Sequence, residues 1–190
     1  IYAFQRGVTI ICAAGNDGRD GVSYPARFPE CLAVSAVGPD KQLAPYSNYG
    51  DEIGIAGPGG NQPMGQDAGV LQNTIHEDTS NPYARGQFRE GFFSLQGTSM
   101  ASPHVAGVAA LLVSMGIKDP NEVRTILRRS AAVALPSNQY GAGLLDAAAA
   151  IQATGKKPAA SQNTWVALAV AAALLLLFVG KEDAFVALLF

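Results

Sequence analysis

The first part of the chain contains three continuous apolar runs of strand length. Residues 8–14 form an apolar, β-branched run that ends at the turn-forming residues 15–18, and residues 31–37 repeat the pattern. Residues 54–59 give a shorter third run, which Pro58 must stop. Such runs, bounded by Gly and Asn, are typical of strands buried on both faces of a parallel sheet. The fold class is therefore predicted to be α/β with a mostly parallel sheet.

Helical periodicity appears in the second half of the chain. Apolar residues recur at helical spacing on nearly all sides of residues 105–116, which predicts a buried helix with residues 102–103 in its early turn. A second helix is expected after Asp119, the candidate N-cap, with Pro120 at its first position. Between residues 60 and 95 the sequence is rich in Gly, Asn and Gln, which predicts a long functional loop or insertion with short strands near its end.

The domain boundary is marked by a change in composition. The last domain element is expected over residues 141–151, and the polar stretch 154–164 is typical of a linker. We expect one domain over residues 1–153. Because the chain enters a strand soon after Ile1, we expect it to begin inside a domain whose N-terminal half is missing, which would leave strand edges exposed.

Residues 165–190 form an apolar tail, for which we predict a C-terminal apolar helix. Its uncharged part, residues 165–179, would span about 22 Å as a helix, short of the roughly 30 Å of a bilayer core. Lys156 and Lys157 would lie outside in an exported protein, against the positive-inside tendency. The sequence leaves two interpretations open, a membrane anchor or membrane-embedded sorting segment, and a helix that packs on protein.

Charge and cysteine content narrow the class of protein. The formal net charge is −2 and no Lys/Arg cluster occurs, so nucleic acid is excluded as a partner. The two cysteines, Cys12 and Cys31, lie inside apolar runs at a spacing that matches no metal-ligand pattern. They are either buried free thiols or a disulfide, and the compartment stays open at this point.

Ser99 is the candidate nucleophile. It follows Gly97 and Thr98 at the end of the predicted loop and precedes the predicted buried helix. A hydroxyl becomes a useful nucleophile only with a base in reach and donors for the oxyanion. The start of a helix supplies unpaired N–H groups and a favourable dipole for developing negative charge. Without further context, however, Gly-Thr-Ser is typical of a loop that ends in an N-cap.

Three blocks of sequence give this serine its context. Residues 97–107, Gly-Thr-Ser-Met-Ala-Ser-Pro-His-Val-Ala-Gly, match without a break the nucleophile motif of the subtilisin-like (S8) serine peptidases. Residues 13–18 resemble the oxyanion-hole loop of that family, and residues 140–147 resemble the closing segment of its catalytic domain. The resemblance covers about residues 1–153 and implies the three-layer subtilisin-like fold.

The resemblance also implies roles for individual residues. Ser99 would be the nucleophile, and the Asn16 side-chain amide would donate to the oxyanion beside the Ser99 backbone N–H. A neutral amide donor suits this task because it buries no charge. The family further implies a substrate pocket with Tyr24 near its base and with these binding residues: Ala13, Ala14, Gly15 and Ser23.

The same resemblance bears on cofactors. No cofactor is required for this chemistry, and no side-chain metal site is predicted. The family often has a cis peptide before the proline matched by Pro25, and calcium-binding carbonyls around the positions of Ala26 and Phe28. A weak calcium site is compatible with the resemblance.

The general base and its orienting carboxylate are absent from this sequence, because the family's His and Asp motifs precede the first strand seen here. His104 matches a structural position of the family, and His76 is expected to be a solvated loop residue. We therefore expect this polypeptide alone to be inactive, with a residual acceleration of about 10³–10⁴ over water at most.

The predicted function is a serine endopeptidase that hydrolyses peptide bonds through an acyl-enzyme on Ser99. Its partner would be a protein or peptide substrate, with contact to a membrane through residues 165–179 in the anchor interpretation, and its location extracellular or membrane-associated. The alternative is a non-catalytic subtilisin-fold module for peptide binding or membrane-tethered interaction. The intact Ser99 and Asn16 favour the enzyme.

Overall fold

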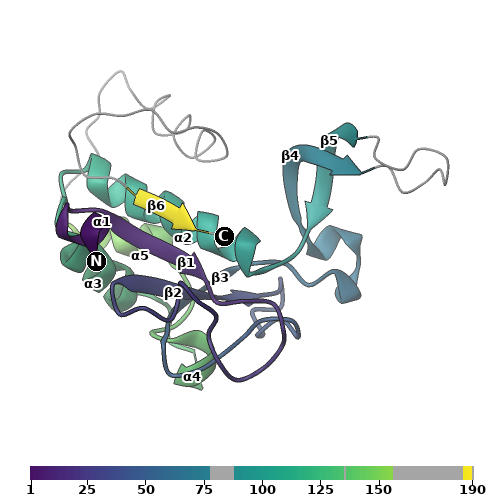
Figure 1. The fold of residues 1–190 in the computed structure, drawn as a ribbon, viewed down its shortest axis with the longest axis horizontal. Helices are drawn as coiled ribbons and strands as arrows, with labels where there is room; N and C mark the ends of the chain where they lie inside the picture. Colours follow the sequence, from purple (N-terminus) through teal and green to yellow (C-terminus); the bar gives the residue numbers. More distant parts are fainter. Residues whose placement is uncertain (78–87, 135, 156–185, 190) are drawn as a thin grey trace.

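A parallel sheet forms the centre of the molecule in the computed structural model, which describes residues 1–77, 88–134, 136–155 and 186–189. Its strands lie in the order β3-β2-β1-β6, and each neighbouring pair is parallel (Figure 1). The first three confirm the predicted apolar runs with ends shifted by one residue or less. The strand bounds are β1 Thr9–Ala13, β2 Cys31–Val37, β3 Ile53–Pro58 and β6 Val186–Leu189.

The two faces of the sheet pack against different layers. One face contributes Ile11, Val34 and Ile55 to a core shared with Val105 and Leu112 of α2. The opposite face packs under α1 and the segment that follows β1. Because neighbouring strand residues point to opposite faces, a strand buried on both faces reads as a continuous apolar run. The helices are α1 Tyr2–Gln5, α2 Thr98–Ser114, α3 Pro120–Ser130, α4 Ser137–Tyr140 and α5 Ala147–Ala153, with 3₁₀ turns at Gln62–Met64 and Gln66–Ala68.

Helix α2 begins earlier than the sequence pattern predicts. It starts at Thr98, so Pro103 lies inside the helix rather than in its early turn. Proline has no N–H for the carbonyl four residues before it, which is the carbonyl of Ser99. Helix α3 begins as predicted, because the Asp119 side chain caps it by accepting the Asn121 N–H at 2.9 Å.

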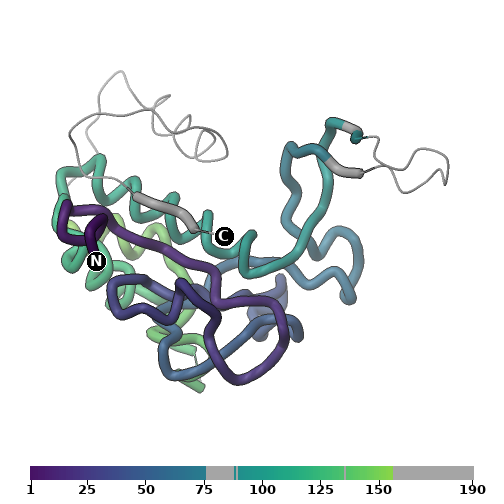
Figure 2. Tube along the Cα trace, in the orientation of Figure 1, coloured from purple at the N-terminus to yellow at the C-terminus, as the bar shows by residue number. Residues whose placement is uncertain are grey.

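The segment between β3 and α2 contains a hairpin where the sequence predicted a long loop. Strand β4 (Val70–Glu77) pairs antiparallel with β5 (Phe88–Leu95), as in the Asn73–Phe92 pair. This hairpin projects from the body near the start of α2 (Figures 1 and 2). The predicted strand near residues 92–95 is confirmed as part of β5, but the loop interpretation of its partner was wrong. Most residues of β4 are polar, and its apolar residues are Val70, Leu71 and Ile75, so it lacks the continuous apolar run of a central strand.

The described end of the apolar tail is a strand. Val186–Leu189 pairs with Thr9–Cys12 along the outer edge of β1, so the predicted C-terminal helix is wrong for these residues. An edge strand offers unpaired N–H and C=O groups, and an extended apolar segment can satisfy them. Residues 165–179 lie outside the described part of the chain. Within that part, no helix has the length and apolar character to cross a bilayer.

Cys12 and Cys31 are buried free thiols on adjacent strands, as one of the two open interpretations held. Burial, followed by the charge and hydrogen bond of the Cys31 thiol, raises the pKa of Cys12 to about 12. Burial also raises the pKa of Cys31. Both thiols are therefore held protonated at neutral pH, which makes them poor nucleophiles.

Candidate active site

Ser99 is the second residue of α2 and is half-buried. The carbonyl of the N-cap residue Gly97 accepts hydrogen bonds from Met100 N at 2.9 Å and from Ala101 N at 3.2 Å. These two bonds form the first turn of the helix, in which Ser99 lies. The sequence predicted Ser99 just before the helix, and the structure includes it in the first turn. This position favours negative charge near the Ser99 backbone.

The loop after β1 is tied to the start of α2 through the Asn16 side chain. Its Oδ1 accepts the Thr98 N–H at 2.8 Å and the Thr98 hydroxyl at 2.9 Å. The Thr98 hydroxyl in turn accepts the Gly15 N–H at 3.2 Å. Because Oδ1 is occupied by Thr98, the amide Nδ2 of Asn16 is the end left for another acceptor. Thr98 is fully buried and was not singled out from the sequence.

A small space beside Gly97 is flanked by two N–H donors. A Cβ built on Gly97 would lie 3.6 Å from Asn16 Nδ2 and also 3.6 Å from Ser99 N. The φ of Gly97 is +152°, in the region where L residues are strained. Glycine therefore places no side-chain atom at this point, which also lies 3.6 Å from Met100 Sδ.

Asn48 organises the loop that carries Asn16, a role that was not predicted from the sequence. It is fully buried, and its Oδ1 accepts the Asp17 N–H at 2.8 Å. Its Nδ2 donates to Ser23 Oγ at 3.3 Å and to Asp17 Oδ2 at 3.2 Å. A buried amide with partners at both ends fixes the loop at low cost. Asn48 lies outside the family motifs, so the sequence did not mark it.

The predicted substrate-pocket residues lie near one another around Gly15. Ser23 N donates to the Ala14 carbonyl at 2.8 Å, and Ala13 is the last residue of β1. A Cβ on Gly15 would collide with Asn48 Nδ2 and lie 2.5 Å from Ser23 Oγ. The Tyr24–Pro25 peptide is cis, as the family resemblance implied.

The described contacts of His104 do not include Ser99. His104 lies on α2, where its Nδ1 is 2.8 Å from the carbonyl oxygen of Met100. This bond to its own helix fits the structural position given by the resemblance. His76 lies in β4 opposite Arg89, so the expectation of a loop residue was wrong, because the hairpin includes it. The side chain of His76 falls outside the described atoms.

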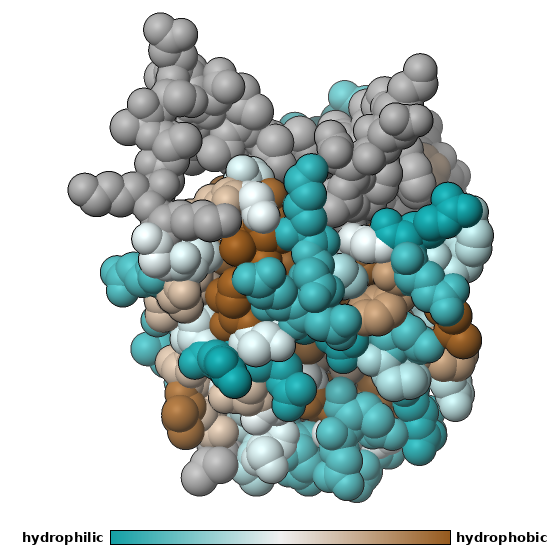
Figure 3. Space-filling model, turned by 90° about the vertical axis from the view of Figure 1, so that its left-hand side faces the viewer, coloured by the Kyte–Doolittle hydropathy of each residue, from teal (hydrophilic) through white to brown (hydrophobic). Residues whose placement is uncertain are grey.

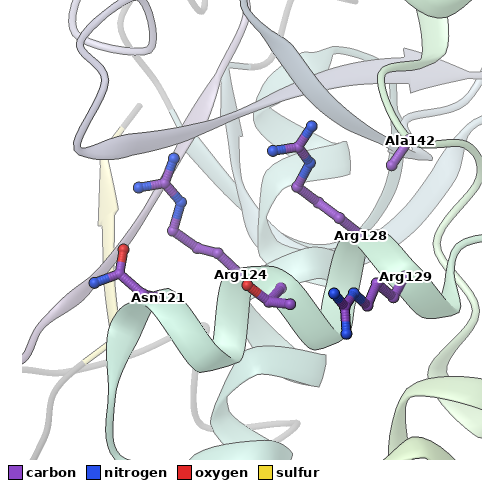
Figure 4. Close-up of a pocket in the computed structure, with 6 residues that line it drawn as sticks. Asn121, Arg124, Arg128, Arg129 and Ala142 are labelled. Carbon is purple, nitrogen blue, oxygen red and sulfur yellow. The ribbon is translucent and has the colours of Figure 1, made fainter.

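A surface pocket of about 450 Å³ lies along α3 and includes none of these residues (Figure 4). Arg124 and Arg128 extend from the same side of the helix (Figure 4). Burial, then the charge of Arg128, lowers the pKa of Arg124. The pocket is lined by Asn121, Arg124, Thr125, Arg128, Arg129 and Ala142.

The face seen in Figure 3, on the side of α1 and α3, is largely hydrophilic with hydrophobic areas between. In the described part of the chain no three His, Cys, Asp or Glu side chains are grouped to hold a metal ion.

Comparison with known proteins places this geometry in one family. The sequence model described as the subtilase family matches residues 1–143. Halolysin of Haloferax mediterranei is 43% identical over 143 residues, which are 75% of this chain and 24% of halolysin. Subtilisin BL of Lederbergia lenta is 36% identical over 149 residues, 78% of this chain and 48% of that protein.

Solved structures agree with these sequence matches. A protease structure from Pseudoalteromonas arctica superposes with a TM-score of 0.68 at 35% identity, covering 79% of this chain and 44% of that one. A lanthipeptide protease superposes with a TM-score of 0.67 at 26% identity, covering 80% of this chain and 53% of that one. The chain thus spans about half or less of the length of these relatives.

Proposed function

Since this chain belongs to the subtilase family, we propose that it carries the nucleophile and oxyanion hole of a serine endopeptidase. The observation that carries the proposal is the space beside Gly97, which has Asn16 Nδ2 and Ser99 N each 3.6 Å from a single point. An acyl-transfer oxyanion needs two such preorganised donors, and neutral donors suit it because they bury no charge of their own.

The chemistry follows from these positions. Ser99 Oγ attacks the carbonyl carbon of the scissile peptide, and its proton passes to a general base. The carbonyl oxygen becomes an oxyanion that accepts from Asn16 Nδ2 and Ser99 N. Collapse breaks the C–N bond, the leaving amine takes the proton from the base, and water then hydrolyses the ester on Ser99.

The general base is a requirement of the proposal. His104 does not meet it, because its Nδ1 contacts the Met100 carbonyl of its own helix. The base and the carboxylate that orients it must come from residues outside those described here. For this reason the activity is assigned to the full-length gene product, and the described chain on its own is expected to be inactive.

The substrate class is a protein or peptide. Ala13, Ala14, Gly15 and Ser23 are small residues that lie near one another, which supports a pocket there for the side chain before the scissile bond. Serine acyl transfer needs no cofactor. A weak calcium site at the carbonyls near Ala26 and Phe28 stays a prediction.

A serine-directed fluorophosphonate tests the assignment on the full-length protein. Wild type and His104→Ala should be labelled on Ser99, and Ser99→Ala should not be labelled. Peptide hydrolysis should disappear with the label. Equal loss of label in Ser99→Ala and His104→Ala would refute the roles given to these residues, and an unlabelled wild-type protein would refute the enzyme.

The location is proposed to be extracellular or membrane-associated. Fractionation of the tagged full-length protein between medium, salt wash and detergent extract separates the two. Recovery only in detergent would support an anchor at residues 165–179, and recovery from the medium would support release.

A further inference from the structure

The hydroxyl of Tyr46 joins three points of the backbone beside the nucleophile. Tyr46 Oη lies 2.8 Å from the Gly59 carbonyl oxygen and 2.7 Å from that of Gly60. It accepts the Gly97 N–H at 3.0 Å. A hydroxyl has one proton and two lone pairs, so this group can donate toward the two carbonyls and accept from Gly97 together.

These contacts lie where the segment that carries the hairpin leaves the body of the protein and returns to it. We call this place, formed by Gly59, Gly60 and Gly97, the neck. Gly59 and Gly60 follow β3 where the chain leaves the sheet, and Gly97 is where it returns, two residues before Ser99. Gly97 N also donates to the Gly59 carbonyl at 3.0 Å. The outgoing and returning segments are therefore held against each other beside the Tyr46 ring, and the hairpin β4–β5 lies beyond this point.

The neck is tightly packed, so Tyr46 has little freedom to adopt another arrangement. A Cβ on Gly59 would lie 2.9 Å from Tyr46 Oη and 2.8 Å from the Gly97 carbonyl oxygen. Burial raises the pKa of Tyr46 to about 12. The hydroxyl therefore keeps its proton, and its ability to donate to the carbonyls, through neutral and moderately alkaline pH.

We propose that Tyr46 is a positioning residue for the catalytic serine, acting through Gly97. By holding the Gly97 amide in place, the hydroxyl holds the backbone of Gly97 and thereby the orientation of Ser99, two residues later. It also keeps motion of the hairpin from displacing the serine. The inference rests on the proposed function and adds to it a residue that lies outside the family motifs read from the sequence.

Tyr140 provides a matched control. It is a second tyrosine with a structural hydroxyl, which accepts the Leu43 N–H at 3.0 Å, and none of its described contacts involves Gly97 or Ser99. Removing the Tyr140 hydroxyl takes the acceptor from the Leu43 N–H, whereas removing the Tyr46 hydroxyl leaves the Gly97 N–H with the Gly59 carbonyl as its acceptor. Only the loss at Tyr46 should change the geometry of the serine.

The test uses Tyr46→Phe and Tyr140→Phe in the full-length protein, assayed with a short chromogenic peptide. We expect Tyr46→Phe to lower kcat about tenfold, with KM within about twofold of wild type, because about two neutral hydrogen bonds are lost. Its rate of fluorophosphonate labelling should fall in parallel. Tyr140→Phe should lower the Tm but leave kcat and the labelling rate unchanged.

A second variant perturbs the same neck from the other side. Gly59→Ala should also lower kcat, and the double variant Tyr46→Phe/Gly59→Ala should fall no further than the worse single variant. The inference is overturned if Tyr46→Phe keeps the wild-type kcat and labelling rate, or if the two losses multiply. A wild-type protein without label or hydrolysis would instead overturn the proposed function, and this inference with it.

Discussion

Asn16 and Thr98 are joined twice, since Asn16 Oδ1 accepts both the backbone N–H and the hydroxyl of Thr98. The pair connects the loop after β1 to the first residue of α2. An amide held by its oxygen presents its nitrogen in a defined direction. The contacts with Thr98 therefore orient the Asn16 amide nitrogen.

Removing the Asn16 amide tests whether it acts as a donor to the oxyanion. Asn16→Ala in the full-length protein should lower kcat by about 10²–10³-fold, the loss known for removal of one oxyanion donor, with little change in KM. Steady-state kinetics on a peptide substrate measures it. Asn121→Ala on α3 is the control and should keep wild-type kinetics; an equal loss there would point to a general folding defect.

Removing the Thr98 hydroxyl tests whether Thr98 orients the Asn16 amide. Thr98→Val keeps the shape of the side chain but deletes the hydroxyl that bonds Asn16 and the Gly15 N–H. We expect kcat to fall about fivefold to tenfold, since one of the two lost hydrogen bonds, that to Asn16 Oδ1, orients the amide and is worth about 1–1.5 kcal/mol. Thr98→Ser retains the hydroxyl and should stay within about twofold of wild type. Full activity in Thr98→Val would contradict the coupling.

Gly15 should be far more sensitive to substitution than another glycine of positive φ. Gly15→Ala places a Cβ against Asn48 and Ser23, whereas Gly7→Ala meets no atom within 4 Å. Both pay the left-handed backbone cost of about 1–2 kcal/mol, and only Gly15→Ala adds an overpacking cost of about 1–3 kcal/mol. Urea unfolding measures the free energy of unfolding of the two variants. Equal losses would contradict the tight packing at Gly15.

The buried thiols predict a loss of stability in alkali. Burial first, and then the neighbouring Cys31 thiol, raises the pKa of Cys12 to about 12 in the folded protein, while an unfolded thiol ionises near pH 8.5. The unfolded state then binds fewer protons, so the free energy of unfolding falls as pH rises above about 8.5 toward 12. Below pH 8.5 the contribution is fully present.

Urea unfolding under reducing conditions at pH 8 and pH 10 measures this effect. Wild type should lose about 1–2 kcal/mol more than Cys12→Ala between the two values. Between pH 6 and pH 8 the two proteins should change in parallel. A wild-type curve no steeper than that of the variant would show that the Cys12 thiol is not held protonated.

The sequence was a good guide wherever a local pattern decides the structure. Continuous apolar runs identified β1 and β2, and the Asp119 cap with Pro120 identified the start of α3. Ser99 could be found because its motif is contiguous. These features depend on neighbouring residues, so they survive without knowledge of the rest of the fold.

Features made by residues distant in the chain were out of reach. Asn48 acts through partners 25 and 31 residues away, and nothing in its local sequence marks it. Thr98 lies inside the nucleophile motif, but its partners are 82 and 83 residues away, so the motif does not show its contact with Asn16. The β4–β5 hairpin was missed because its strands do not pack into the hydrophobic core and so lack a continuous apolar run. The pairing of Val186–Leu189 with β1 depends on a free edge of the sheet, which the sequence of these residues does not show. Local periodicity carries none of this information.

The hairpin has a practical consequence for handling the protein. Its register puts Leu71, Ile75, Phe88 and Phe92 on one face, where each side chain is 61–72% exposed. An uncovered apolar face of this kind promotes self-association, and the unpaired edges of a two-stranded sheet add to it. Phe92→Ser should raise the concentration at which light scattering detects aggregates, whereas Asn73→Ser, on the same face, should not. Solubility would then be limited by the hairpin, even though the sheet and α2 hold the fold together.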